Sequence, residues 1–243
     1  QDALLTSDKT RNEGLDELFV RAKALEAERD TAMERDPYFD YGEAFLQIAI
    51  VLGGVAIISG GSSVLISSVV VAALGALMTL NGAWHRVRDD ATLRFMFVAA
   101  VFYGLSTFEG SFMAIRSVNA LSHYTDWTVG HVHAGALGWV AMITFGAIYA
   151  SVPWLWKQKS MWSPRLVEVH FWLALAGTLI YVFAMWNSGI IQGLMWRTYN
   201  ESGTLAYSFV QSLEAMHPYY IARAVGGLFF LIGAVVGCYN IWM

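Results

Sequence analysis

Charged residues and cysteines are both scarce in this chain of 243 residues. Only 14% of the residues are charged, whereas a soluble domain carries roughly 25%, and 56% are hydrophobic. This composition excludes a soluble globular protein for most of the chain. The single cysteine, Cys238, excludes a disulfide framework and a cysteine-based metal site. Lysine and arginine form no basic patch, which argues against nucleic acid as a partner.

The few charges are concentrated at the start of the sequence. Residues 1–43 hold 12 acidic and 6 basic residues, and the remaining 200 positions hold 7 and 9. Within residues 13–36 a narrow apolar stripe at a spacing of three to four predicts a charged helix, with Leu15, Leu18, Phe19, Ala22 and Leu25 along it. Asp36-Pro37 is expected to end this helix. It is interpreted as a solvated helix leading into a bilayer, with a coiled-coil contact as the alternative.

Six apolar stretches approach the length of about 20 residues that a helix needs to span a bilayer. They cover residues 44–60, 64–84, 95–115, 128–152, 166–192 and 221–243. The sequence therefore predicts an all-α, polytopic membrane bundle of about six transmembrane helices, preceded by a charged cytoplasmic helix. The expected parts are a charged segment (1–43), a transmembrane hairpin (44–84) and a four-helix domain (85–243).

Basic residues in the short loops predict the orientation, because cytoplasmic loops carry more lysine and arginine. The loops after the second and fourth spans are the most basic, with Arg86, Arg88, Arg94, Lys157, Lys159 and Arg165. Both loops are therefore expected on the cytoplasmic side, which places both termini there as well. Tryptophans near the span ends fit interfacial positions, namely Trp84, Trp127, Trp154, Trp156 and Trp196.

Ionisable residues inside a span are costly and are candidates for function. His170, with Glu168 beside it, lies within a turn of the cytoplasmic end of the fifth span, where interfacial solvation accounts for both. His131 and His133 open the fourth span in the run HVHAGALGW. Side chains two residues apart on an α-helix point about 200° from each other. One metal ion therefore cannot bind both imidazoles, but two planar haems can each take one.

The glycines around this pair, Gly130, Gly135 and Gly138, leave room for a flat ring to approach the helix backbone. The simpler alternative for both histidines is a hydrogen-bonded packing role. Glu109, in STFEGSFMAI, is expected at the level of the histidines. It is a candidate proton relay or a hydrogen-bond partner of a ligand histidine, with a neutral packing role as the alternative. Tyr103 lies six residues away and cannot share a helix face with Glu109.

Residues 76–242 resemble the C-terminal part of the catalytic subunit of cbb3-type cytochrome c oxidases, the C-family haem-copper oxygen reductases. The runs that carry the resemblance are MTLNGAWHRVRDDATLRF, FYGLSTFEGSFMAI, VNALSHYTDWTVGHVHAGALGWVAMITFGAIY, NSGIIQGLMWR and SFVQSLEAMHPYYIARAVGG. The resemblance implies that His131 is the proximal ligand of a high-spin haem and His133 an axial ligand of a low-spin haem. It places Glu109 beside the high-spin haem and Tyr103 in a proton-uptake channel from the cytoplasm.

The same resemblance implies low-spin and high-spin haem b as cofactors, together with copper. The family's copper ligands and its other low-spin haem ligand belong to upstream helices whose motifs do not occur in this sequence. The implied setting is the bacterial inner membrane, as a multi-pass protein in the lipid bilayer. The implied partners are oxygen and other oxidase subunits, including membrane-anchored c-type cytochromes. A non-catalytic membrane protein that binds one haem or none is the alternative.

Residues 1–70 do not follow the oxidase pattern. The charged helix and the run YFDYGEAFLQIAIVLGGVAIISG resemble, more weakly, a small uncharacterised bacterial membrane-protein family of the DUF4337 type. The chain is thus interpreted as a composite of a foreign hairpin and the last four helices of an oxidase subunit. A natural fusion, a split gene and an engineered chain all remain open.

Overall fold

The computed structural model describes residues 14–59, 62–79, 81 and 83–243, and this part of the chain is almost entirely helical. Residues 1–13 of the expected charged segment, and positions 60, 61, 80 and 82 of the expected hairpin, lie outside the described residues. The helices are α2 (Leu15–Ser59), α3 (Ser62–Thr79), α4 (Trp84–Val87), α5 (Ala91–Met113), α6 (Arg116–Ser122), α7 (Asp126–His133), the π-helix η1 (Ala134–Ala141), α8 (Met142–Leu155), α9 (Pro164–Met195) and α10 (Phe209–Trp242).

Five of the described helices are long and apolar enough to cross a membrane. They comprise Leu15–Ala56, Ala91–Met113, Asp126–Leu155, Pro164–Met195 and Phe209–Trp242, and α3 is a shorter apolar helix between the first two. These helices coincide with the six predicted spans, so the all-α polytopic membrane bundle is confirmed. The chain is a multi-pass membrane protein.

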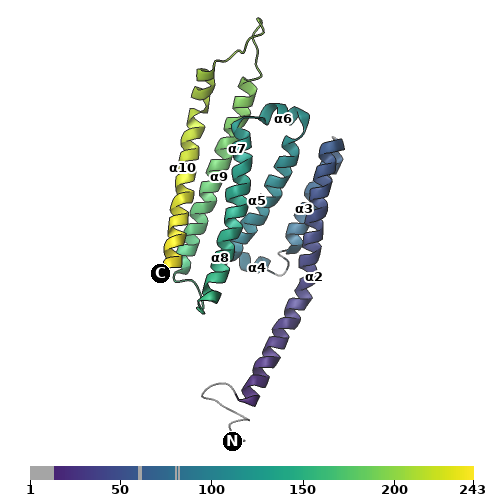
Figure 1. Ribbon diagram of the computed structural model, residues 1–243, viewed down its shortest axis with the longest axis vertical. Helices are drawn as coiled ribbons and strands as arrows, with labels where there is room; N and C mark the ends of the chain where they lie inside the picture. Colours follow the sequence, from purple (N-terminus) through teal and green to yellow (C-terminus); the bar gives the residue numbers. More distant parts are fainter. Residues whose placement is uncertain (1–13, 60–61, 80, 82) are drawn as a thin grey trace.

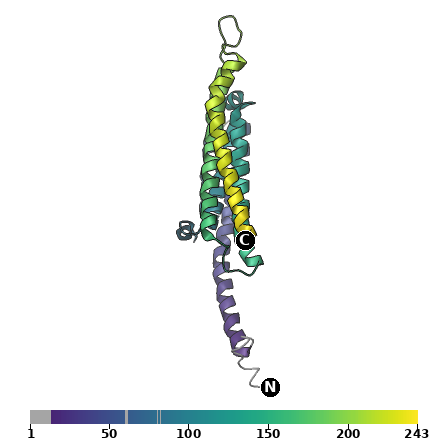
Figure 2. The ribbon, with the colours of Figure 1, turned by 90° about the vertical axis from the view of Figure 1, so that its left-hand side faces the viewer.

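The long helices run lengthwise beside one another in both views (Figures 1 and 2). α6 and the α9–α10 connection lie at one end of the bundle in Figure 1, and α4 and the α8–α9 connection lie at the other. The first half of α2 projects beyond the bundle at this second end, where α10 also finishes. Successive long helices therefore alternate in direction, as the sequence predicts.

The predicted break at Asp36-Pro37 is wrong, because α2 runs through Pro37 without interruption. Proline removes one backbone hydrogen bond in a helix interior and crowds the preceding turn. Here the residues around Pro37 are all exposed, so water can solvate the carbonyl that loses its partner. The helix therefore continues through this exposed stretch.

The core lies between α5, α8, α9 and α10. Its fully buried side chains include Phe95, Met142 and Phe171, and partly buried residues such as Phe145 and Phe230 pack against this cluster. Gly177 of α9 and Gly226 of α10 face each other so closely that a Cβ at Gly177 would lie 2.6 Å from the Gly226 carbonyl oxygen. Small residues at such a crossing let two membrane helices approach closely.

Candidate functional site

The candidate site is built on the membrane-spanning segment formed by α7, η1 and α8. Both histidines lie in the last turn of α7. Thr125 caps the start of α7 by accepting a hydrogen bond from the Trp127 backbone N–H. The π-helix begins directly after His133. Single π-helical turns inside α-helices occur often at functional sites. The two imidazoles therefore sit at a change of helical pitch.

His131 faces α5, where it meets Glu109. The carboxyl group of Glu109 is buried, and its Oε1 accepts a hydrogen bond of 2.7 Å from Nε1 of Trp127. Its Oε2 lies 3.4 Å from Nδ1 of His131. Gly110 contributes to this contact, because a Cβ there would come within 3.3 Å of the His131 ring. One carboxyl group thus holds two side chains of α7.

His133 faces α9. Its Nδ1 lies 2.8 Å from the carbonyl oxygen of Val129, one turn earlier on the same helix. A carbonyl oxygen only accepts hydrogen bonds, so the proton of a neutral His133 is on Nδ1 and the Nε2 lone pair is free. The ring stacks on Tyr181 of α9 with centroids 4.4 Å apart and planes 24° apart.

The predicted divergence of the two histidines is confirmed, since one contacts α5 and the other α9. The predicted depth of Glu109 is confirmed as well by its contact with His131. The glycines of this helix were predicted to leave room for a flat ring beside the backbone, and in the structure side chains of this chain fill that room at two of them. The ring of Trp186 packs against Gly130, and the ring of Phe102 packs against Gly138. Flat rings do approach the backbone there, but they are side chains of this chain.

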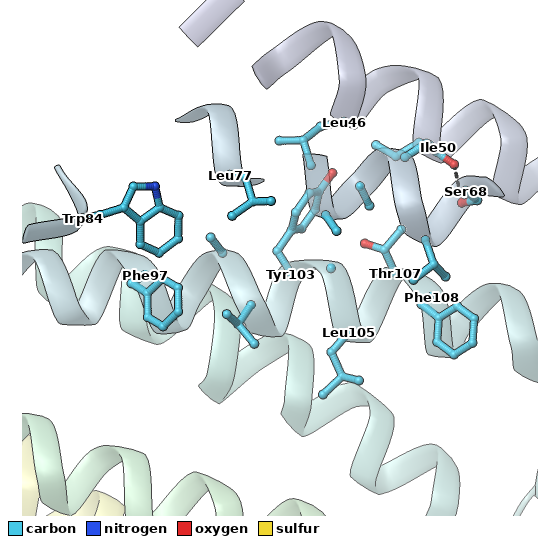
Figure 3. A pocket seen from close by; sticks show the side chains of 17 residues that line it. Leu46, Ile50, Ser68, Leu77, Trp84, Phe97, Tyr103, Leu105, Thr107 and Phe108 are labelled. Atoms are coloured by element: carbon cyan, nitrogen blue, oxygen red, sulfur yellow. Dashed lines mark hydrogen bonds between the residues drawn. The ribbon is translucent and has the colours of Figure 1, made fainter. Parts of the chain in front are cut away.

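Tyr103 lies on another face of α5, as its spacing from Glu109 predicts. Its ring packs against that of Trp139 with centroids 4.5 Å apart. Its side chain also lines a cavity between α5 and the α2–α3 hairpin (Figure 3). The structure therefore brings Glu109, His131 and Trp127 together and leaves Tyr103 outside this group.

The roles of Trp127 and Asp126 are not evident from the sequence. Trp127 lies near a span end, at the start of α7, and its indole N–H is directed to buried Glu109. Asp126 accepts a hydrogen bond of 2.6 Å from the Ser188 hydroxyl of α9, and its backbone N–H donates to the Gln192 side chain. These contacts fix the start of α7 against α9. A tryptophan in the same short run as the histidine pair is the only sequence signal for them.

The expectation of interfacial solvation for His170 is wrong. His170 is 1% exposed, and its Nδ1 lies 2.7 Å from the hydroxyl of Tyr149. The α10 glycines Gly233 and Gly237 allow this, because α10 passes directly over the ring. Glu168 remains partly exposed and pairs with Arg94, consistent with a place near the interface.

The donors at the site fit haem. Both imidazoles have Nδ1 engaged and Nε2 available, which is how a ligand histidine is oriented by its neighbours. Imidazole nitrogen is a common axial ligand of haem iron. Each ring faces a different neighbouring helix, so each can serve a separate haem. Among the described residues, no group of three or more histidine, cysteine or carboxylate side chains is placed to hold a metal ion.

Comparison with known proteins gives a family. Residues 44–229 match the family described as cytochrome C and quinol oxidase polypeptide I, and residues 1–85 match a domain of unknown function, DUF4337. The chain is 58% identical over 170 residues to the cytochrome c oxidase subunit 1 homolog, bacteroid, of Bradyrhizobium diazoefficiens, covering 70% of this chain and 31% of that protein.

Two further relatives agree. Identity to the cbb3-type cytochrome c oxidase subunit CcoN1 of Stutzerimonas stutzeri is 57% over 169 residues, covering 70% of this chain and 36% of that protein. Identity to the cytochrome c oxidase subunit 1 of Rhodobacter capsulatus is 50% over 169 residues, covering 70% of this chain and 32% of that protein. The matched segment spans about a third of these relatives' length. With a family match over most of its residues, the chain belongs to the cytochrome c and quinol oxidase polypeptide I family.

Proposed function

We propose that this chain is the haem-binding part of the catalytic subunit of a cbb3-type terminal oxidase. Such an assembly takes electrons from cytochrome c and reduces oxygen to water, coupled to proton translocation. The observation that carries the proposal is the pair of imidazoles on opposite faces of α7, each with Nδ1 engaged. Haem b, when bound at each Nε2, supplies electron transfer at one site and oxygen binding at the other.

His131 is the proposed ligand of the high-spin haem, and Glu109 positions it. The Glu109 carboxylate lies at Nδ1 of His131, where it orients the ring and increases the basicity of the ligating nitrogen. Trp127 donates to the other carboxylate oxygen and holds the carboxyl group in place. Because Glu109 is buried, water competes little for these contacts.

His133 is the proposed ligand of the low-spin haem. The Val129 carbonyl fixes its tautomer, and the Tyr181 ring limits its rotation. Tyr103 is the proposed proton-path residue. It stands about midway along α5, between the end of the bundle that carries α4 and the level of Glu109. A hydroxyl at that depth can pass a proton towards the site from the α4 end.

This chain covers only about a third of the relatives' length, so the complete activity requires helices from elsewhere. Copper and the second low-spin ligand belong to that missing part. The proposed setting is the bacterial inner membrane, with both termini cytoplasmic. The proposed partners are the remaining helices of the oxidase and its membrane-anchored c-type cytochromes.

Optical spectra of single variants test the proposal. In an assembly that supplies the missing helices, His131→Ala is expected to remove the high-spin component of the reduced-minus-oxidised spectrum and to leave the low-spin component. His133→Ala is expected to do the reverse, because an axial ligand has no substitute nearby. His123→Ala, in an exposed position before α7, is the matched control and is expected to retain both components.

The outcomes separate three cases. Loss of the same component in both variants means that the HVH run serves one haem. A purified chain without any haem signal, even after haem is supplied, favours a non-catalytic membrane protein. If both variants keep the high-spin and the low-spin component, the two histidines are packing residues and not haem ligands.

A further inference from the structure

Helix α10 carries an arginine within the membrane-spanning bundle. Arg223 lies fourteen residues into this helix and is partly buried, and its Nη1 is 3.8 Å from the sulfur atom of Met185 on α9. Met185 is fully buried and stands ten residues before the end of α9, about 15 Å along the helix axis. A charged side chain at such a depth is costly and is therefore a candidate for function.

The groups that contact this guanidinium are uncharged. Besides the Met185 sulfur, they include the ring of Tyr220, whose centroid is 4.9 Å away. The carboxylate of Asp126 also interacts with Tyr220, but it accepts a hydrogen bond of 2.6 Å from the Ser188 hydroxyl. None of the ion pairs found among the described residues includes Arg223. In this part of the chain the arginine therefore has no ion-pair partner.

The guanidinium lies close to the level of His133. A Cβ at Gly130 of α7 would come within 3.2 Å of the Met185 side chain, so Gly130 and Arg223 flank the same methionine. Gly130 precedes His133 by less than one helical turn. The ring of Tyr181 stacks on His133, and its hydroxyl is near enough for the charge of Arg223 to act on it. The arginine and the proposed low-spin ligand thus belong to one region of α7, α9 and α10.

We propose that Arg223 binds a carboxylate of the haem that His133 ligates, an inference that rests on the proposed function. Haem b carries carboxylate groups, and a carboxylate inside a membrane needs a counter-charge as much as an arginine does. The planar guanidinium suits this partner because it donates two parallel hydrogen bonds to a carboxylate. A carboxylate on one of the missing helices is the competing partner for the arginine.

Haem and its dimethyl ester test this pair, because the ester has the same iron and ring but no carboxylate. The full chain with His131→Ala, in detergent, retains His133 as its proposed ligand, and each compound is titrated into it spectrophotometrically. Haem is expected to bind at least about tenfold more tightly than the ester, as a hydrogen bond between charged groups predicts. This comparison needs no change at Arg223, so it does not depend on how an Arg223 variant folds.

Substitutions then identify the arginine as the cause. Arg223→Gln is expected to reduce the preference for haem over the ester by at least about tenfold, because glutamine has no charge. Arg223→Lys is expected to retain part of the preference. Arg165→Gln, at an exposed arginine near the start of α9, is the matched control and is expected to keep it. In a His133→Ala chain that retains His131, Arg223→Gln is expected to have no effect.

The outcomes distinguish this pair from the haem site itself. Equal binding of haem and ester, or a preference that Arg223→Gln leaves intact, overturns the pair but not the binding of haem by His133. An effect of Arg223→Gln in the His133→Ala chain assigns the arginine to the other haem and also overturns the pair. If neither compound binds to the chain, the proposed function fails together with this inference.

Discussion

At the scale of single residues, Glu109 is the side chain that organises the candidate site. Its two oxygens meet Trp127 and His131, and both partners come from the same short helix. A buried acceptor with two donors is costly to change, because each donor left without a partner retains its desolvation penalty. The residue therefore acts on the histidine and on the fold together.

Glu109→Gln separates these two effects. The amide retains one acceptor oxygen, so haem content is expected to be unchanged. The ligand histidine loses its negatively charged neighbour and becomes a weaker donor to iron, so the haem potential is expected to rise. A redox titration followed by optical spectroscopy measures the haem potential. Glu168→Gln, on the partly exposed pair with Arg94, serves as the control. An unchanged potential would assign Glu109 to packing alone.

The buried pair Tyr149–His170 gives a prediction on stability. The Tyr149 hydroxyl is 2.7 Å from His170 Nδ1, and both side chains are buried. Tyr149→Phe leaves that nitrogen without a partner, which is expected to cost about 1–3 kcal/mol. Thermal unfolding in detergent measures the loss. Tyr239→Phe, at an exposed ring on α10, should change the unfolding temperature little, and equal effects of both changes would contradict the argument.

The sequence predicts the individual residues of the site unevenly. The opposite faces of His131 and His133 follow from helical periodicity alone, and the structure confirms them. The burial of His170 does not follow, because it depends on glycines of α10, more than sixty residues away, that allow that helix to pass over the ring. Local periodicity carries no information about such a neighbour.

At the scale of elements, the membrane-spanning segment that carries the histidines changes from an α-helix (α7) to a π-helix (η1) and back to an α-helix (α8). The run AGALGWVA has no proline that would announce an irregular turn. Because nothing in this run distinguishes π-helical from α-helical turns, the sequence predicts a regular helix instead; the structure shows that η1 contacts both α5 and α9. The opposite error occurs at Pro37, where a residue that usually ends a helix is tolerated in exposed backbone.

The contact between α9 and α10 gives a prediction at this scale. A Cβ at Gly177 would lie 2.6 Å from both the Gly226 carbonyl oxygen and the Phe230 backbone nitrogen. Backbone atoms cannot rotate away as a side chain does, so Gly177→Ala must push the helices apart. Overpacking of this kind costs typically about 1–3 kcal/mol.

Unfolding of Gly177→Ala in detergent checks this cost against Gly227→Ala as control. Gly227 lies on α10 next to the contact, but a Cβ there would meet no atom within 4 Å. The control is expected to be neutral or slightly stabilising, because alanine favours a helix more than glycine does. Equal stability of the two variants would show that α9 and α10 are not held at the described distance.

At the scale of the whole molecule, the hairpin is packed chiefly on itself. Gly42 of α2 and Gly75 of α3 meet so closely that a Cβ at Gly75 would lie 2.9 Å from the Gly42 carbonyl oxygen. Ser68 also donates a hydrogen bond of 2.7 Å to the Ala49 carbonyl oxygen. Towards α5, by contrast, the hairpin leaves a cavity of about 530 Å³. The hairpin is therefore a self-contained pair of helices with a loose contact to α5, and the match to the oxidase family begins within it, at residue 44.

The membrane orientation is the last prediction, and it concerns every span together. Arg86, Arg88, Lys157 and Lys159 lie in the connections at the α4 end of the bundle, whereas the connection 196–208 lies at the opposite end (Figure 1). Reporters fused at Gln158 and at Leu205 are therefore expected on opposite sides of the membrane, with Gln158 cytoplasmic. Removing positive charge near one loop tests the cause: Lys157→Gln with Lys159→Gln should weaken the preference at Gln158. Reporters on the same side would contradict the alternating direction of the helices. Reporters on opposite sides with Leu205 cytoplasmic would agree with the alternating helices but show that the predicted orientation in the bilayer is inverted.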